Sequence, residues 1–393
     1  MGYQLIDNIP VWGKPQEGAV AQIRNCARQC DLCALMADHH LGYAVPIGGV
    51  VAYHDKISPS GVGYDISCGN KAVRLDLDAA ELRRHIGKIM DDIWKTVSFG
   101  IGMKNKDPVE HPLFAEDPAW DIDVAAGLWT LAQSQLGTVG SGNHYVDLFV
   151  DELDRVWCGV HFGSRGFGHK LATHYIRAGG GKDGINVDPV LLEAESALGK
   201  EYLACMHLAG RYAYAGRDWV CDRVAELLGS RILESVHNHH NFAWRETHFG
   251  EELWVVRKGA TPAFPGQRGF VGGSMGDASV ILEGVDGEES ATALYSTVHG
   301  AGRVMSRTAA RGKRRWKKGG PQPSGSISRK MMMTWVNGKG VELRGADTDE
   351  SPHCYKRLPE VLAYHADTIR IVHTLQPVGV AMAGPDIRDP YRD

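Results

Sequence analysis

Six residues able to carry out chemistry stand in five short segments spread over most of the chain. In chain order they are Asp65 and Cys68 in Gly-Val-Gly-Tyr-Asp-Ile-Ser-Cys-Gly, His144 in Gly-Ser-Gly-Asn-His, His161 in His-Phe-Gly-Ser-Arg-Gly, His240 in His-His-Asn, and His299 in His-Gly-Ala-Gly-Arg. One carboxylate, one thiolate and three imidazoles suit a first-row transition metal better than Ca or Mg. A fourth imidazole is left over. The pattern predicts a metal centre that one fold assembles from distant segments.

Each segment alone is weak support for a metal. Asp65 and Cys68 by themselves are more typical of a polar turn with a buried cysteine. Near His240 the choice of ligand stays open, because His237 and His239 lie in the same short stretch. The joint occurrence of five segments favours the metal centre over these separate readings.

The segment that begins at His299 has the composition of a phosphoryl-transfer site. A histidine that attacks phosphorus needs a free ring nitrogen and cations nearby. Arg303 and Arg307, four residues apart on an expected helical turn, supply such cations; the alternative is a helix N-terminus with solvated arginines. Upstream, residues 272–276 (Gly-Gly-Ser-Met-Gly) could cradle phosphate with backbone N–H groups, although no Gly-Lys-Ser/Thr follows as in a Walker A loop.

A basic run extends from Arg303 to Lys318 and contains Trp316 but no acidic residue. Residues 311–328 read as a basic loop with many Gly, Pro and Ser. One interpretation is phosphate-backbone binding with one stacking aromatic ring. The other is a mobile solvated loop, and both can hold together.

Two further patterns resemble known sites but are discounted. Cys26, Cys30 and Cys33 have the spacing of a radical-SAM cluster site, but they fall in a predicted helix, where they would lie along one face instead of wrapping a cluster. Asp38-His39-His40 resembles the signature of a metal-dependent phosphoesterase family. The other Asp-rich motifs of that family are missing.

Composition sets broad limits on the function. The chain has 393 residues, of which 43% are apolar and 23% charged, with a formal net charge of −4. These values are ordinary for a folded protein with a large core, and they give no bulk signal for nucleic acid. The N-terminus lacks a signal-peptide pattern, and no apolar run has membrane-spanning length. We therefore expect no membrane association, a cytoplasmic location and eight cysteines that are reduced or metal-bound.

We expect one α+β domain over residues 1–393, with mixed β-sheet layers flanked by helices, and a C-terminal tail at 385–393. Hydrophobic periodicity predicts helices at 20–36, after Asp78 (an N-cap with Glu81 three residues on), at 120–133, over much of 188–233, and at 359–373. Strands are predicted at 50–53, 71–76, 144–150 and 156–162, in short pieces over 252–285, and from the last helix through Met382. Residues 100–118 are predicted to be loop. The strands 144–150 and 156–162 form a predicted hairpin that carries His144 and His161 near opposite ends.

Taken together, the segments make the chain resemble the RtcB family of RNA-splicing ligases, from about Ile9 to Gly384. The matching stretches are Met36–Val50, Gly61–Gly69, Gly140–Asp147, His161–Gly168, His240–Asn241, Arg257–Phe264, Gly273–Gly276 and His299–Arg307. The resemblance implies an RtcB-like fold and an enzyme that joins an RNA 3′-phosphate or 2′,3′-cyclic phosphate to a 5′-hydroxyl end in RNA repair or tRNA splicing, using GTP and two Mn²⁺ ions. It also implies RNA as the substrate, and an archease-type activator or a translation- or ribosome-associated factor as a protein partner.

The same resemblance implies roles for individual positions. His299 resembles the nucleophile that carries covalent GMP, and Asp38 resembles an acidic residue near the reacting centre. Asp65, Cys68 and His144 resemble the ligands of one Mn²⁺; Cys68, His161 and His240 resemble those of the second, with the Cys68 thiolate shared. Positions matching nucleotide contacts are Asn143, Asp147, Lys258, Gly273, Ser274, Met275, Gly300, Ala301 and Tyr355, and those suited to RNA phosphates are Arg165, Arg303 and Arg307.

The chain departs from the family pattern where the family contacts guanine. The family ends in Val-Lys-Gly, and the aligned ending here is Ala381-Met382-Ala383-Gly384, so the lysine is absent. Asp147 replaces a glutamate that also faces the base. A shorter carboxylate and a lost ammonium weaken hydrogen bonding to the base edge, which predicts a divergent paralogue with relaxed or altered nucleotide choice.

Two other functions compete with the ligase. A metal-dependent phosphoesterase or cyclic-phosphate hydrolase would keep the metals without nucleotide transfer, but retention of His299, Arg303 and Arg307 favours the ligase. A non-catalytic RNA-binding protein would need neither a thiolate nor three imidazoles.

Overall fold

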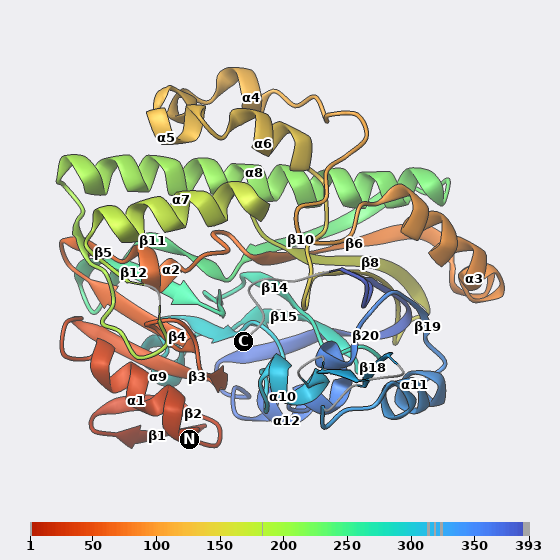
Figure 1. The fold of residues 1–393 in the computed structure, drawn as a ribbon. Helices are drawn as coiled ribbons and strands as arrows, with labels where there is room; N and C mark the ends of the chain where they lie inside the picture. Colours follow the sequence, from red (N-terminus) through yellow and green to blue (C-terminus); the bar gives the residue numbers. More distant parts are fainter. Residues whose placement is uncertain (1, 183, 313–314, 318–319, 323–324, 388–393) are drawn as a thin grey trace.

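Two β-sheets form the centre of the computed structural model, and helices cover them on several sides (Figure 1). The structure describes residues 2–182, 184–312, 315–317, 320–322 and 325–387. The first sheet has the order β1-β2-β3-β4-β12-β11, with antiparallel neighbours except for the parallel pair β2–β3. Its strands are β1 (Tyr3–Ile6), β2 (Ile9–Trp12), β3 (Leu32–His40), β4 (Ile47–Tyr53), β12 (Glu251–Lys258) and β11 (Asn241–His248).

The second sheet has the order β10-β6-β8-β7-β20-β15-β14, and β19 adds to β20 in parallel. Its strands are β10 (Ile232–His239), β6 (Gly69–Asp78), β8 (Arg155–Phe162), β7 (Tyr145–Asp151), β20 (Ile369–Met382), β15 (Ser279–Gly284), β14 (Arg268–Val271) and β19 (Glu342–Arg344). The two outermost strands lie against each other. Asn238 on β10 accepts from the Phe270 N–H on β14, and Asn70 on β6 donates to the Phe270 carbonyl, both at 2.9 Å.

Three short strand pairs complete the β structure. They are β13 (Ala260–Pro262) with β16 (Ser296–Val298), β5 (Lys56–Ile57) with β9 (Leu192–Glu193), and β17 (Arg315–Lys317) with β18 (Gly320–Gln322). Residues 313–314, 318–319 and 323–324 of the predicted basic loop, and residues 388–393 of the predicted tail, lie outside the described residues.

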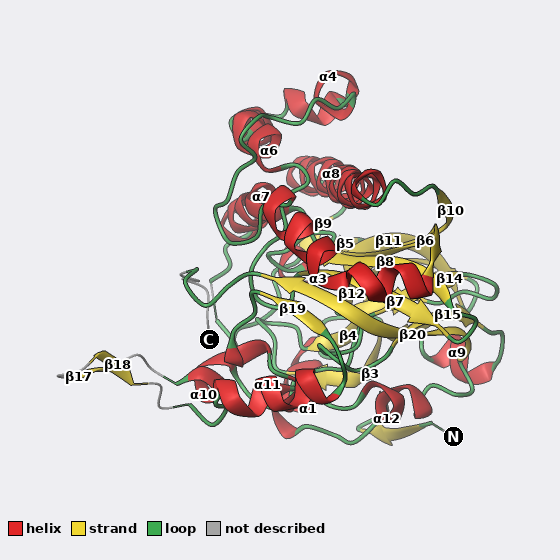
Figure 2. Cartoon of the chain, turned by 90° about the vertical axis from the view of Figure 1, so that its right-hand side faces the viewer, coloured by secondary structure: helices red, strands yellow, loops and turns green. Residues whose placement is uncertain are grey.

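Two helices lie side by side over the sheets, and short helices stack beyond them (Figures 1 and 2). The two are α7 (Arg165–Ala178) and α8 (Ala197–Leu227), and above α8 lie α4 (Leu113–Glu116), η1 (Pro118–Asp121), α5 (Asp123–Ala126) and α6 (Trp129–Gln135). The others are α1 (Glu17–Cys26), α2 (Pro59–Val62), α3 (Ala79–Thr96), α9 (Glu288–Thr292), α10 (Arg307–Arg311), α11 (Arg329–Gly338), η2 (Thr348–Glu350), η3 (Pro352–Cys354) and α12 (Leu358–Ala363). No helix in the described ranges is long and apolar enough to cross a membrane.

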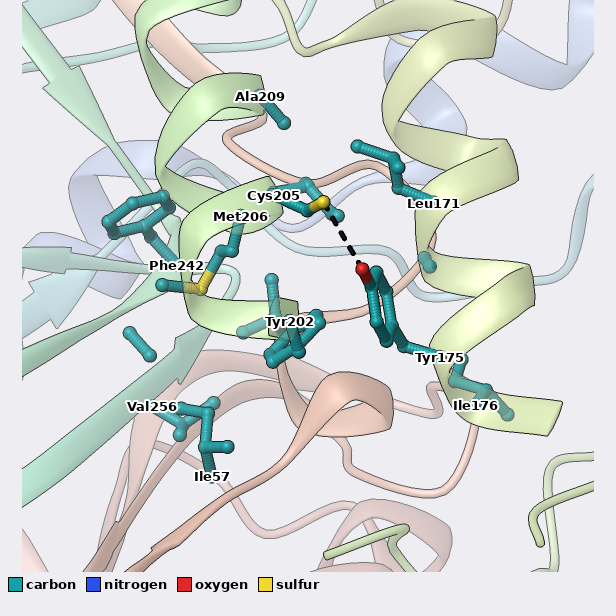
Figure 3. Packing of buried hydrophobic residues seen from close by; sticks show 14 of the residues in the cluster. Ile57, Leu171, Tyr175, Ile176, Tyr202, Cys205, Met206, Ala209, Phe242 and Val256 are labelled. Carbon is teal, nitrogen blue, oxygen red and sulfur yellow. Dashed lines mark hydrogen bonds between the residues drawn. The ribbon is translucent and has the colours of Figure 1, made fainter. Parts of the chain in front are cut away.

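The largest part of the core fills the space between α7, α8 and the first sheet (Figure 3). Leu171 and Tyr175 of α7 face α8, where the Tyr175 hydroxyl donates to the Cys205 sulfur at 3.2 Å. Phe242 and Val256 of the first sheet complete the cluster on the side of α8 away from α7. Burying these side chains stabilises the fold by roughly 1.5–3 kcal/mol each, so the helix that starts beside the site rests on a rigid base.

The α+β class and most of the expected elements are confirmed. The α3 cap forms as predicted, because the Asp78 carboxylate accepts from the Glu81 N–H at 2.8 Å. The hairpin of β7 and β8, the long helix within 188–233 and the short strands within 252–285 are also present.

Several predicted boundaries are wrong. The helix predicted at 20–36 ends at Cys26, and Leu32–His40 is a buried strand; a short apolar run fits a buried strand as well as a helix. The helix predicted at 359–373 ends at Ala363, and a strand begins at Ile369 because it pairs with β15. The helix predicted at 120–133 is broken into η1, α5 and α6, and the predicted loop before it contains α4.

Candidate metal centre and active-site cavity

The five predicted metal-binding side chains come together in two groups that share one thiol. Asp65, Cys68 and His144 form one group, and Cys68, His161 and His240 form the other; within each, the ligand atoms lie within 4.8 Å of one another. The Cys68 Sγ atom is 3.5 Å from His144 Nε2 and 3.3 Å from His161 Nε2. The Asp65 carboxylate is 3.1 Å from His144 Nε2.

Strand pairing places these ligands. His161 on β8 pairs directly with Tyr145 at the start of β7, so His144 and His161 lie at the same end of the hairpin. The prediction of opposite ends is therefore wrong, since the first residue of one antiparallel strand faces the last residue of the other. Of the histidines near His240, it is the His240 ring that joins Cys68 and His161, and its backbone N–H donates to the Cys68 carbonyl at 2.8 Å.

The ring orientation of His161 suits metal binding. Its Nδ1 atom is 3.0 Å from the Asn143 carbonyl, so it carries the proton and leaves the Nε2 lone pair toward Cys68. Burial holds the pKa values of His161 and His240 well below the usual range, and so both rings are neutral. The predicted nucleotide residue Asn143 therefore orients a ligand ring through its backbone.

The donor set fits a bound metal ion. Ligand bonds of about 2.0–2.3 Å around a tetrahedral ion place neighbouring donors roughly 3.3–3.8 Å apart, and the two sulfur–nitrogen separations fall in this range. Burial, and then the charge of Asp65, raises the pKa of the Cys68 thiol well above its usual value. A cation in the site would remove that proton and bind the thiolate.

His299 lies beside the metal groups and rests on Asp38. Its ring is 4.9 Å from that of His240, and its Nδ1 atom lies 2.6 Å from the Asp38 carboxylate. The same carboxylate oxygen accepts from the backbone N–H groups of His299 (3.0 Å) and Gly300 (3.3 Å). Burial opposes ionisation of Asp38, but His299 and Lys356 outweigh it and hold its pKa below the usual value. The His299 Nδ1 atom thus lies at ion-pair distance from the charged carboxylate without a hydrogen bond within the described residues, and Nε2 is the ring nitrogen left for chemistry.

One cavity of about 1080 Å³ contains the whole arrangement. It is lined by the five candidate metal-binding side chains, by His299 and by every residue predicted to contact nucleotide or RNA; Asp38 lies buried behind His299. Its size is at or above the upper end of the range for small-molecule sites, about 300–1,000 Å³. There is room for a nucleotide and part of a second substrate.

Sequence comparison fits this geometry. Residues 19–129 and 115–383 match the model of the family described as tRNA-splicing ligase RtcB. The chain belongs to the RtcB family. It is 33% identical to the RNA-splicing ligase RtcB of Escherichia coli K12, over 96% of this chain and 99% of that protein. It is also 30% identical to the tRNA-splicing ligase RtcB of Thermococcus kodakarensis, over 88% of this chain and 86% of that protein.

The RtcB residues expected to meet RNA phosphates are held by the protein itself. Arg165 is buried, and its guanidinium donates to Thr138 and to the Gly100 carbonyl. Arg303 and Arg307 do not share a helical turn as predicted: Arg303 lies in an extended segment bridged to Tyr355, and Arg307 begins α10. Both arginines contact Glu350, at 3.3 and 3.1 Å, so their charges are partly compensated.

The residues predicted to bind phosphate are held in place by hydrogen bonds within the protein. The Lys258 ammonium donates to the Tyr43 and Ser60 carbonyls at 2.5 and 3.0 Å, and burial lowers its pKa to about 8. In the glycine-rich segment, the Ser274 hydroxyl donates to Asp277 at 2.7 Å. These contacts fix both polar groups on the cavity wall without a ligand.

Of the two departures from the RtcB pattern, Asp147 lines the cavity, and the other follows Met382, which also lines it. Asp147 on β7 pairs with Val380 of β20, and Met382 pairs with Tyr145. Burial raises the pKa of Asp147 well above the usual carboxyl value, and one of its oxygens has no hydrogen-bond partner among the described residues. A neutral carboxyl group therefore stands where the family pattern has a longer carboxylate, and Ala383 stands where it has the lysine.

One residue under the metal groups was not predicted from sequence. Arg217 of α8 is fully buried and donates to the carbonyls of Ser67 (3.0 Å) and Phe162 (2.6 Å). It also contacts ring nitrogens of His237 (2.8 Å) and His239 (3.1 Å). Three of these four partners are direct sequence neighbours of candidate metal-binding residues, so Arg217 ties together the segments that bear them.

Of the two discounted patterns, the cysteine pattern remains outside the metal site, whereas Asp38 and His40 of the other lie at the cavity. Cys26 ends α1 and Cys33 lies on β3, and within the described ranges neither they nor Cys30 join a group able to share an ion. Such a group does form at Asp151, Glu152 and His373, where Arg155 already donates to Asp151 and contacts His373.

Proposed function

We propose that this chain is an RNA ligase that joins an RNA 3′-phosphate or 2′,3′-cyclic phosphate end to a 5′-hydroxyl end through a covalent His299–GMP intermediate. Membership of the RtcB family supports the RNA ligase class. The observation that carries the proposal is the contact of His299 with the buried Asp38 carboxylate, next to the metal-binding groups in one cavity. A phosphoesterase needs metals but has no need for a histidine oriented in this way.

Two Mn²⁺ ions fit the donor set under this proposal. Asp65, Cys68 and His144 would hold one ion, and Cys68, His161 and His240 the other. When bound, such ions neutralise phosphate charge and orient an in-line displacement.

The protein residues carry the nucleotide transfer. Asp38 retains the proton on Nδ1, and the His299 Nε2 lone pair attacks the α-phosphorus of GTP. A nitrogen–phosphorus bond forms while the bond to pyrophosphate breaks. GMP then passes to the RNA 3′-phosphate, the 5′-hydroxyl attacks that activated end, and GMP leaves. A cyclic phosphate is first opened by hydrolysis. Lys258, Arg303 and the backbone of Gly300 lie on the cavity wall, where they can meet phosphate oxygens.

The side chains at the predicted base-binding end of the cavity support an altered nucleotide choice. Asp147 and Met382 face the cavity where Tyr145 and Met275 are also found. A neutral carboxyl can both donate and accept a hydrogen bond, whereas the ammonium of the family pattern only donates. Discrimination between guanine and adenine is therefore expected to be weaker than in RtcB proteins with the lysine.

Nucleotide labelling tests the proposal. The protein is incubated with Mn²⁺ and each of the four ribonucleoside triphosphates, radiolabelled at the α-phosphate, and then separated by denaturing electrophoresis. We expect an acid-labile labelled band that is lost in His299→Ala and kept in the exposed-histidine control His85→Ala. The strongest label identifies the preferred base. Absence of label with every nucleotide, together with hydrolysis of a cyclic-phosphate RNA, would replace the ligase with the phosphoesterase.

A further inference from the structure

One arm of the cavity runs along α7, away from the metal groups. Lys170, Thr173 and Arg177 line it and recur every three to four residues, which places them on one face of the helix. The opposite face, with Leu171 and Tyr175, is buried against α8 (Figure 3). Lys170 and Arg177 are exposed. The outer face of α7 is therefore an open wall of the active-site cavity.

This wall is positively charged, although the chain as a whole is acidic. Residues 165–178 contain Arg165, Lys170 and Arg177 and no Asp or Glu, whereas the whole chain has a net charge of −4. Arg165 is buried at the metal end, and the other two cations lie further along the helix. Cations arranged in this way favour a polyanion that extends from the metals along α7.

Aromatic rings lie beside the same arm. Tyr64, the residue before Asp65, stacks on His169 of α7 with ring centroids 5.2 Å apart and planes at 28°. Tyr43 meets Tyr64 edge-on at 6.0 Å and is 41% exposed. All three rings line the cavity. Aromatic faces next to cations are the combination that binds unpaired bases together with their phosphates.

We propose that the α7 arm, defined by Tyr43, Tyr64, His169, Lys170 and Arg177, binds a single-stranded RNA segment leading away from the end being joined. Seven residues separate Lys170 and Arg177, which corresponds to about 10 Å along the helix. At about 3.4 Å per stacked nucleotide this spans roughly three nucleotides. A duplex is disfavoured, since its bases are stacked on each other and unavailable to the tyrosines. This inference rests on the proposed ligase function and assigns the part of the RNA that the cavity holds.

The test measures RNA affinity in charge-changed variants of the full chain. Fluorescence anisotropy with a labelled ten-nucleotide single-stranded RNA is recorded between 50 and 300 mM salt, values chosen as about the range where phosphate contacts respond. For the double variant Lys170→Glu/Arg177→Glu we expect at least about 10-fold weaker binding than wild type. The slope of log affinity against log salt should fall by about 1.4, at about 0.7 per single-strand phosphate contact. Lys170→Gln/Arg177→Gln should show the same slope change with a smaller loss of affinity.

A matched control distinguishes local contacts from general charge. Arg84→Glu/Lys88→Glu makes the same charge change on exposed positions of α3, which do not line the cavity. Affinity equal in the α7 and α3 variants would overturn the proposal, as would equally tight binding of a duplex of the same length. Nucleotide labelling of the wild-type protein at His299 distinguishes failure of the α7-arm proposal from failure of the proposed function. A protein that labels but loses no RNA affinity in the α7 variants refutes only the arm, whereas a protein that never labels refutes the proposed function.

Discussion

Replacing Arg217 by methionine should both destabilise the fold and weaken metal binding. The guanidinium is fully buried and donates hydrogen bonds to the Ser67 and Phe162 carbonyls. Hydrogen bonds from a charged donor contribute about 1.5–3 kcal/mol each, and the two contacts to His237 and His239 add about 1 kcal/mol each. Removing a buried charge recovers part of this through lost desolvation. We therefore expect a net loss of about 3–5 kcal/mol.

That loss corresponds to a measurable change in melting temperature. Unfolding entropy is about 2.1 cal/mol/K per residue, or about 0.8 kcal/mol/K for the 393 residues if they unfold together. The Tm of Arg217→Met should then fall by about 4–6 °C in calorimetry of the metal-free protein. Arg217→Lys keeps the charge but loses the planar guanidinium group, so its Tm should lie between those of wild type and Arg217→Met.

Measuring Mn²⁺ affinity distinguishes a role of Arg217 in positioning the candidate ligands from a role in the overall stability of the fold. Ser67, Phe162 and His239 each precede or follow a metal-binding residue, so loss of Arg217 frees the segments that bear Cys68, His161 and His240. Mutations of this kind cost about 10–100-fold in metal affinity, measured by Mn²⁺ titration below the melting temperature. Arg223→Met is the control on the same helix, because its exposed pair with Glu226 contributes under about 1 kcal/mol. A Tm and Mn²⁺ affinity for Arg217→Met equal to those of the control would refute the reasoning.

Three further predictions follow from individual contacts. Asp38→Asn removes the charge beside His299 while preserving shape, and should slow nucleotide labelling by about 100-fold or more without changing Mn²⁺ stoichiometry. The ammonium of Lys258 is present below its pKa of about 8 and lost above it, so nucleotide affinity should fall from pH 7 to pH 9.5 in wild type but not in Lys258→Arg; equal profiles would contradict this. Glu246→Gln should lower unfolding free energy at pH 7 by about 3–5 kcal/mol, because it leaves Arg257 buried and unpaired. The pKa of Glu246, which burial raises but Arg257 and His248 lower overall, is below its usual value, so the difference in urea denaturation should shrink as the pH falls below about 4.3.

The candidate metal ligands could be predicted from sequence, but the buried residues that hold their segments in place could not. Cysteine, carboxylate and three histidines in short segments are a compositional signal that survives without any structure. Arg217 has a weaker signal: it stands four residues after Ala213 and three before Val220, on the buried stripe of a long helix. A charged residue on such a stripe needs buried partners, which indicates a structural cation, but its partners come from three other segments. Glu350 likewise meets Arg303 and Arg307 only through the tertiary fold.

Errors in the predicted helices and strands also arise from tertiary contacts that the local sequence does not show. The run from Leu32 to Ala37 is apolar on both faces because Leu35 packs in one core cluster and Ala34 and Met36 in another, and so it carries no alternation that distinguishes a strand from a helix. At Ile369, where a helix was predicted, pairing with Gly284 on β15 stabilises a strand instead. Local caps were predicted correctly where the capping contact lies within one turn, as at Asp78.

Sheet order explains why residues so far apart in sequence form one metal-binding group. Cys68 precedes β6, His161 lies near the end of β8, His144 precedes β7 and His240 follows β10, and these four strands are consecutive neighbours. Because adjacent strands are antiparallel, the starts of two and the ends of the other two meet at one edge. Strand spacing of about 4.8 Å then sets the separation of the ligands.

His299 and Asp38 reach the same edge from the other layer. Asp38 lies on β3 of the first sheet, and His299 directly follows β16, which pairs with β13. The candidate metal ligands therefore depend on the second sheet, Asp38 on the first and His299 on the small β13–β16 sheet. His240 joins the first two sheets directly, since β10 ends at His239 and β11 begins at Asn241, and packing between the layers brings the other groups within reach. Loosening that packing should impair nucleotide transfer before it impairs metal binding, whereas a shift in the pairing of β6 with β8 should abolish both.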